Sequence, residues 1–481
     1  MKRTVTILNE RRCLFLITAF LLIASLGIFP IIKASGEEKE VQILTLEETL
    51  RITAEKNRDI QKAREFRNQV EGRYIEERAA ALPQFVFTAY ATNQRDDSLK
   101  AYGGFLPLQQ KNRSAELGVS QSLFTWGQVG AAIRAAKVGI ATADDQLRIF
   151  RQAAFRDVSA SFYDILLAKV LNAIAIQNLE QKTRHYDEAS KKYLAGVATD
   201  YDVLAAKVAV ENARPIVIRT ENLIRISREN LRFLLANAQE VDVQGSLEAT
   251  ITPYPRVEEV LEVAIKNRPE LFDLRHRIEV AKELVKIANA GDKPRLDFKA
   301  AYGYRELDLG QDNHAHGGEW SIGLFVTYPI FDGLRTRGRV SQAKSNVRTL
   351  KIEEAKLLDS FKLEVHDACN AVREAGEIVK ALSGTVEQAE RVLYMAEKGY
   401  EYGIKTRLDV DDAELNLVQS NGNLARAKRD YLVAWVNLER VKGTLGEKEE
   451  AHKCWGEEPK IKFKAQSLKS ETGTYFCTCQ E

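Results

Sequence analysis

Two short stretches, AGVATDYDVLAA (residues 195–206) and YGIKTRLDVDDA (residues 402–413), contain the same spacing G-x-x-T-x-x-D-V. They begin about 207 positions apart, and each stands between two long segments with helical periodicity. A glycine suits the left-handed residue that follows a helix, and a threonine followed three residues later by an acid suits the cap of the next helix. The spacing predicts two tight helical turns capped by Gly196, Thr199, Gly403 and Thr406, with Asp202 and Asp409 completing the caps.

Other stretches repeat in the same order and at nearly the same offset. EETLRITAEKNRDI (47–60) resembles VEEVLEVAIKNRPEL (257–271), and QSLFTWGQVGAAIRAAK (121–137) resembles YPIFDGLRTRGRVSQAK (328–344). Self-similarity at a fixed offset is the mark of an internal repeat. We therefore expect two copies of one architecture.

The hydrophobic period changes in the same order within each copy, from helical to alternating and back to helical. A long segment without proline, from about Gln128 to Leu194, would form a helix of roughly 100 Å. The expected organisation is a first repeat (35–236: a helix, a β-hairpin at 84–124, a long helix at 128–195, a return helix at 199–236), a linker (237–255), a second repeat (256–446: a helix, a β-hairpin at 295–331, a long helix at 335–402, a return helix at 406–445) and a tail (447–481).

A helix of 100 Å cannot be enclosed in a globular core, so it must pack lengthwise against other helices. The return helices carry apolar residues seven apart, as at Val217, Ile224 and Leu231 and again at Tyr431 and Leu438. A seven-residue period predicts coiled-coil packing. Pro215 is expected to kink or interrupt the first return helix.

The alternating segments have the length of membrane-spanning strands, about 10 to 13 residues. From Leu296 and from Trp320 every second residue is apolar, whereas the residues between them are polar or small. Tyr302, Tyr304 and Trp320 gather at the loop end of the second hairpin, as an aromatic girdle would. A soluble hairpin with one face on a core has the same alternation. Four strands are too few to close a barrel, so a barrel requires several chains.

Composition limits the classes of function. Charged residues make up 29% of the 481 residues but the net charge is only +2, which argues against nucleic acid as a partner. The start has basic residues before an apolar run from Leu14 to Ile32, so residues 1–34 are interpreted as a secretory signal peptide. An uncleaved membrane anchor is the alternative for the same run.

Together these features resemble the TolC-like outer-membrane efflux channel family. The resemblance extends from about Leu46 to Gly446 and depends on the duplicated order of elements, on YPIFDGLRTRGRVSQAK (328–344) and on GYEYGIKTRLDVDDAELNL (399–417). It implies a mainly α fold with a small β part, in which long helical hairpins form an α-barrel tunnel. It also implies a homotrimer, in which four strands per chain contribute to a 12-stranded transmembrane β-barrel surrounded by outer-membrane lipid.

The same resemblance implies a function and partners. The chain is expected to be the outer-membrane duct of a tripartite efflux or type I secretion system, with a long periplasmic part. Its implied partners are a periplasmic adaptor (membrane fusion) protein and an inner-membrane pump of the RND, ABC or MFS type. Neither nucleic acid nor a cofactor is expected.

The resemblance also implies roles for residues near the two helical turns. Asp409 and Asp412 match positions that form a constriction at the periplasmic entrance, and Asp202, Tyr400 and Lys405 match a network that holds the tip closed. The best-known member of the family has arginine at the position that matches Lys405. Lysine lacks the planar two-point contact of arginine with a carboxylate, so the lock is expected to be weaker.

Two alternatives stay open. A periplasmic coiled-coil adaptor or scaffold would explain the helices but not the alternating strands. The outer-membrane component of a metal-cation exporter is suggested by His314, His316, Cys477 and Cys479, although two histidines in a polar loop are a weak indication of a metal site. No nucleophile–histidine pattern or phosphate loop is present, so we expect no enzymatic activity.

Overall fold

The structure is a computed structural model that describes residues 41–98, 109–248, 251–308 and 314–446. The expected signal peptide, Cys477 and Cys479 lie outside these residues. The described residues are mainly helical, as the sequence predicts.

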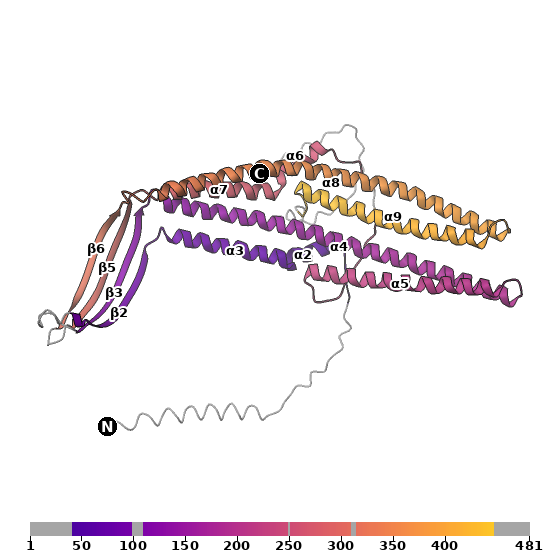
Figure 1. Ribbon diagram of the computed structural model, residues 1–481, viewed down its shortest axis with the longest axis horizontal. Coiled ribbons are helices and arrows are strands. Elements are labelled where there is room, and N and C mark those ends of the chain that lie inside the picture. The colour runs from indigo at the N-terminus through magenta and orange to yellow at the C-terminus, as the bar shows by residue number, and fades with distance from the viewer. Residues whose placement is uncertain (1–40, 99–108, 249–250, 309–313, 447–481) are drawn as a thin grey trace, which may run out of the picture. The chain divides into compact units, whose positions relative to one another are not determined.

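The two repeats have the same order of elements (Figure 1). The first consists of α2 (Leu46–Lys56), α3 (Arg58–Ala79), β2 (Gln84–Arg95), β3 (Gln109–Phe124), α4 (Gln128–Leu194) and α5 (Asp200–Leu235). The second consists of α6 (Val257–Asn267), α7 (Pro269–Asn289), β5 (Arg295–Asp308), β6 (His314–Thr327), α8 (Arg335–Glu401) and α9 (Arg407–Lys442). Both long helices have 67 residues and both return helices have 36, so the duplication extends to the lengths of the elements.

The helix expected at the start of each repeat is divided into two. The side chain of Asn57 accepts hydrogen bonds from the backbone N–H groups of Asp59 and Ile60, and its Nδ2 donates to the carbonyl of Leu234 at 2.8 Å. Asn57 therefore ends α2 and caps α3. In the second repeat, Pro269 is the first residue of α7 and its ring disfavours a helical Arg268.

Other bounds also differ from the sequence-based expectation. The second return helix ends at Lys442 rather than at residue 445, because Gly443 adopts the left-handed conformation (φ 76°). The strand expected to reach Phe331 ends at Thr327.

Helix α5 is continuous through Pro215 from Asp200 to Leu235, so the expected interruption is wrong, whereas the expected kink stays a prediction. Proline removes one N–H donor, which leaves the carbonyl of Glu211 without its helical partner. Pro215 and Glu211 are both exposed, so water can satisfy that carbonyl.

The four long strands form one antiparallel sheet in the order β2-β3-β5-β6. The register aligns Phe87 with Leu117, Leu117 with Tyr302, and Tyr302 with Trp320. This row belongs to an apolar face, and the next row toward the helices carries Ile322 on the same face. The opposite face carries polar rows such as Gln84, Ser120 and Lys299.

The apolar face is exposed in the single chain. On β6, Trp320, Ile322, Leu324 and Val326 are 64 to 73% exposed. Both edge strands, β2 and β6, also have one side without a partner strand in the sheet.

A second, small sheet was not anticipated. Strand β1 (Gln42–Leu44) pairs in parallel with β4 (Val241–Val243), which lies in the linker between the repeats. The carboxylate of Asp242 forms ion pairs with Lys169 and Arg228, each at 2.8 Å. These ion pairs hold the linker against α4 and α5.

The two largest hydrophobic cores of the described residues hold the helices together, one in each repeat. In the first, Val158, Phe162 and Ile165 of α4 pack with Leu231 and Leu235 of α5. In the second, Val365 and Val372 of α8 pack with Tyr431 and Leu438 of α9. The seven-residue rows of the return helices therefore supply buried residues in both repeats.

Helix α4 is long and apolar enough to cross a membrane by length and composition. Ala154, Phe155 and Ile165 are buried within the chain, however, and Gln152 and Asp145 are buried beside them. The apolar character of α4 therefore reflects packing against several helices.

Candidate functional site

The two hairpin turns are built alike. In the first, the N–H of Gly196 donates to the carbonyl of Tyr193 and that of Val197 donates to Lys192, which is a Schellman ending. In the second, Gly403 donates to Tyr400 and Ile404 donates to Gly399 in the same pattern. Gly196 and Gly403 have φ values of 76° and 73°, a conformation that residues with a Cβ adopt at a cost.

Each turn is followed by a complete capping box. The N–H of Thr199 donates to Asp202 Oδ2 at 2.8 Å, and Thr199 Oγ1 accepts from the N–H of Asp202 at 3.3 Å. Thr406 and Asp409 repeat these distances. The backbone and hydroxyl hydrogen bonds from the threonine lower the pKa of both aspartates, so the carboxylates are charged at the turns.

The three residues expected to close the tip do not meet within one chain. Asp202 is engaged in its own capping box. Lys405 Nζ lies 3.4 Å from Asp409 Oδ1, and the Tyr400 ring faces Lys192 Nζ at 5.5 Å from its centroid. None of the three residues therefore contacts another of them in the single chain.

Asp412 lies one turn beyond Asp409 on α9 and is exposed. It forms no ion pair or side-chain hydrogen bond with another described residue. Unlike Asp409, Asp412 has no part in the helix cap.

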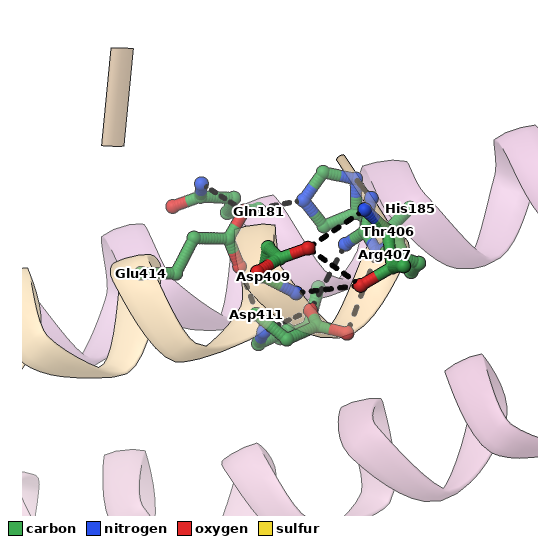
Figure 2. Close-up of polar contacts among 8 residues, drawn as sticks. Gln181, His185, Thr406, Arg407, Asp409, Asp411 and Glu414 are labelled. Atoms are coloured by element: carbon green, nitrogen blue, oxygen red, sulfur yellow. Dashed lines mark hydrogen bonds and ion pairs between the residues drawn. The ribbon is translucent and has the colours of Figure 1, made fainter. Parts of the chain in front are cut away.

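A charged cluster that the sequence did not predict joins the two hairpins near these turns (Figure 2). We call it the α4–α9 polar cluster. It consists of Gln181, Lys182 and His185 on α4 and of Arg407, Asp411 and Glu414 on α9.

Glu414 is the centre of the cluster, and its side chain is only 1% exposed. Its carboxylate accepts hydrogen bonds from Gln181 Nε2 at 2.6 Å, Lys182 Nζ at 2.7 Å and His185 Nε2 at 2.7 Å. Burial raises the pKa of Glu414, but the hydrogen bonds from His185 and Lys182 outweigh burial and lower the pKa to about 2. Glu414 is therefore a buried anion with three donors from the other hairpin.

The second half of the cluster surrounds the other ring nitrogen of His185. Arg407 Nη1 lies 3.0 Å from His185 Nδ1, and Arg407 Nη2 lies 3.1 Å from Asp411 Oδ1. Because a guanidinium can only donate, His185 must accept at Nδ1 and donate from Nε2, which assigns the neutral tautomer. Lys182 Nζ also lies 2.9 Å from Asp411 Oδ1, so both acids of the cluster are paired with α4.

The sequence contained one indication of this cluster. Glu414 follows the buried Val410 and Ala413 on the apolar side of α9, where a charge requires a partner. The partners lie more than 220 residues earlier in the chain, and no local pattern connects them.

At the other end of the long helices, the expected girdle residues lie on the apolar face of the sheet. Tyr302 pairs directly with Trp320, and Tyr304 follows two residues along β5. All three side chains are more than half exposed.

His314 and His316, expected in a loop, lie at the start of β6 and belong to no group of three potential metal ligands among the described residues. His314 Nδ1 lies 3.4 Å from Asp308 Oδ1, and the His316 ring lies against Tyr304. Within the described ranges no group of three or more potential ligands could hold a metal ion.

Comparison with known proteins shows the family. The outer membrane efflux protein family matches residues 49–237 and 260–444, that is, both repeats. The chain belongs to this family. Its members are outer-membrane channels rather than enzymes, so this protein is an outer-membrane channel protein for efflux.

Individual relatives are similar in sequence to most of the chain. The outer membrane protein TolC of Vibrio cholerae is 24% identical over 383 residues, which cover 77% of this chain and 84% of the relative. TolC of Escherichia coli is 23% identical over 408 residues, covering 82% and 81%.

Solved structures share the fold. The CmeC outer membrane channel of Campylobacter jejuni matches with a TM-score of 0.72 at 16% identity, covering 85% of this chain and 88% of that one. CusC, described in connection with transmembrane channel formation, matches with a TM-score of 0.71 at 17% identity, covering 83% and 92%.

Proposed function

We propose that three copies of this chain form an exit duct, in which a twelve-stranded barrel crosses the outer membrane and a helical tunnel continues into the periplasm. The observation that carries this proposal is an open four-stranded sheet with an exposed apolar face and two unpaired edges. Lipid does not satisfy unpaired backbone groups, so strands in a membrane must close into a barrel. Pairing β6 of one copy with β2 of the next would remove every edge.

The aromatic residues would then mark one boundary of the lipid-facing band. Tyr302 and Trp320 lie on the apolar face in the middle of β5 and β6, and Tyr304 lies two residues further along β5, so the strands extend past the expected loop-end position toward the loop. Aromatic side chains favour the level of the lipid headgroups, where one end of the ring is in apolar surroundings and the other is wet.

The turns of the two hairpins lie at the opposite ends of α4 and α8 from the strands, and we propose that they form the periplasmic gate. Three copies of Asp409 and Asp412 around the axis would form rings of negative charge. Such rings favour cations and restrict flow where the passage is narrow. Contacts among Asp202, Tyr400 and Lys405 of neighbouring copies would hold the gate closed.

The α4–α9 polar cluster would act beside that gate as a latch inside each copy. Opening the tip by moving the α8–α9 hairpin away from α4 would have to separate Glu414 from Lys182 and His185. Removing one partner of a buried charge leaves the other without compensation, which is costly. The latch therefore favours the closed arrangement.

A duct of this kind requires partners that load it. The relatives include an efflux pump outer membrane protein of Pseudomonas putida and an alkaline protease secretion protein of Pseudomonas aeruginosa. We propose that the tip docks a periplasmic adaptor and an inner-membrane pump of the RND, ABC or MFS type. The metal-cation exporter would be the same duct with a different cargo.

Single-channel recording tests the duct and its gate together. The wild-type chain should insert into planar bilayers as a heat-modifiable trimer with small, cation-selective conductance. Asp412→Asn should raise the conductance and reduce the cation selectivity, because it removes one ring of charge.

The matched control is Thr406→Ala, which weakens the cap by about 1 kcal/mol without changing any charge. It should leave the selectivity unchanged. A chain that never perforates a bilayer would refute the duct, whereas unchanged selectivity in Asp412→Asn would refute only its place in the gate.

A further inference from the structure

The first turns of α8 carry an unbalanced positive charge. Residues 335–351 contain six basic residues and no acidic one, whereas the counterpart segment 128–144 contains two basic residues and one acidic one. Cations near the start of a helix oppose its dipole and are unfavourable there. The stability of α8 therefore does not explain their position.

Four of these residues share one face of the helix. They are Arg337, Lys344, Arg348 and Lys351, which we call the α8 basic stripe. Their spacings of seven, four and three residues place them on one side of a helix. All four are exposed, and none forms an ion pair with a carboxylate of the described residues.

An apolar groove between α3, α4, α7 and α8 shows which side of the helical layer the α8 basic stripe occupies. Asn346 lies two residues from both Lys344 and Arg348, so it lies about 160° away from each around the helix. Asn346 and Leu350 line this groove. The stripe therefore lies on the opposite side of α8 from this groove.

The groove in turn lies on the side of the polar sheet face. Glu77, Ala132 and Ile287 line the groove, and they also line a depression at the junction with the sheet. That depression is lined by residues of the polar sheet face, among them Ser120 and Lys299. The α8 basic stripe is thus on the same side of the chain as the apolar sheet face.

The stripe also begins next to the end of the sheet. Strand β6 ends at Thr327, and the following Tyr328 and Ile330 are 57% and 89% exposed. Helix α8 begins at Arg335, and Arg337 is its third residue. Apolar and aromatic residues followed by cations are the order found where a protein passes from hydrocarbon to lipid headgroups.

We propose that the α8 basic stripe binds the headgroups of anionic phospholipids in the leaflet that faces the periplasm. This inference rests on the proposed function, because it requires lipid around the apolar face of the sheet. Charge complementarity and continuity with that face support this occupant. Anionic lipids attract cations close to the membrane surface, by roughly fivefold in affinity for each one.

The contribution of each of the four residues to lipid binding should decrease with its distance from the membrane. At 1.5 Å per residue, Lys344 lies about 10 Å beyond Arg337, Arg348 about 16 Å and Lys351 about 21 Å. The attraction of a charged surface decays within about 8–10 Å at physiological salt. Arg337 should therefore contribute most, Lys344 less, and Lys351 almost nothing.

The experiment compares the lipid-dependent melting temperature of the full-length trimer in detergent micelles doped with phosphatidylglycerol or with phosphatidylethanolamine. Phosphatidylglycerol should raise the wild-type melting temperature more than phosphatidylethanolamine does, and high salt should abolish the difference. Arg337→Gln plus Lys344→Gln should lose most of the difference, whereas Arg337→Lys should keep it. The control Lys380→Gln removes an exposed charge about 65 Å from Arg337 along α8 and should keep the full difference.

The outcomes separate this inference from the duct itself. A trimer that conducts in bilayers but shows no preference for phosphatidylglycerol overturns the lipid site and leaves the duct intact. An equal loss in Lys380→Gln overturns it too, since the effect would then reflect net charge alone. If Arg337→Gln plus Lys344→Gln dissociates the trimer without any added lipid, the stripe belongs to the contact between copies, and the lipid proposal is wrong.

Discussion

Glu414 keeps its charge between two helices only because three donors from α4 surround it. The folded-state pKa of about 2 lies below the ordinary value of 4.5. A lowered carboxylate pKa contributes stability that is fully present above the ordinary pKa and is lost as the pH falls toward the folded-state pKa. The latch should therefore be intact at neutral pH and weaken between about pH 4.5 and pH 2.

This linkage gives a prediction for Glu414→Gln. Between pH 5 and pH 2 the free energy of unfolding of the wild-type protein should fall by on the order of 3 kcal/mol more than that of the variant. Denaturant unfolding at several pH values measures this difference. Asp412→Asn is the matched control, because Asp412 contacts no other described charge, and it should follow the wild-type curve. A variant with the full wild-type pH dependence would show that Glu414 is not the group that titrates.

The turn residues could be predicted from the sequence because a cap is local. Thr199 and Asp202, like Thr406 and Asp409, lie three residues apart, and the hydrogen bonds of the box need no other part of the chain. The α4–α9 polar cluster could not be predicted in this way. Which side chain of α4 faces Glu414 depends on the relative rotation and shift of two helices from different repeats, and neither leaves a local pattern.

At the scale of elements, the long helices follow from periodicity, whereas their breaks follow from single side chains. Asn57 ends α2 because its amide can reach the carbonyl of Leu234, a residue 177 positions away. The start of α7 at Pro269 could be predicted from the sequence, since proline is favoured at the first helical position. Strand β4 was missed because three residues, Val241–Val243, are too few for an alternating pattern to stand out.

Pro215 provides a test at this scale. Since α5 is continuous, Pro215→Ala should restore the hydrogen bond to the carbonyl of Glu211 and raise the free energy of unfolding by roughly 1–3 kcal/mol. Arg214→Ala, the adjacent exposed residue, should change it by less than about 0.5 kcal/mol. The measurement is the thermal midpoint of the purified protein by circular dichroism. A lower midpoint in Pro215→Ala would mean that the proline shapes α5 for a contact with another copy or a partner.

At the scale of the whole molecule, the duplication determines which parts have to cooperate. Each repeat supplies two strands, and β3 of the first pairs with β5 of the second, so neither repeat completes the four-stranded sheet alone. The sequence predicted the strands through alternation, but the pairing of β3 with β5 joins residues such as Leu117 and Tyr302 that lie far apart in the chain. In the proposed trimer, each chain likewise depends on the other copies to complete the barrel.

The position of the sheet in the membrane can be tested with two neighbouring residues. Ile322 lies on the apolar face and Ser321 on the polar face, near the middle of β6. A lysine facing lipid costs about 2–4 kcal/mol at mid-depth and less toward the headgroups, whereas a lysine facing a water-filled lumen costs little. Ile322→Lys should therefore sharply reduce the amount of heat-modifiable trimer recovered from outer membranes, and Ser321→Lys should leave it close to wild type. If Ser321→Lys were the more damaging change, the polar face would be the one in contact with lipid, and both the duct and the lipid-binding stripe on α8 would have to be abandoned.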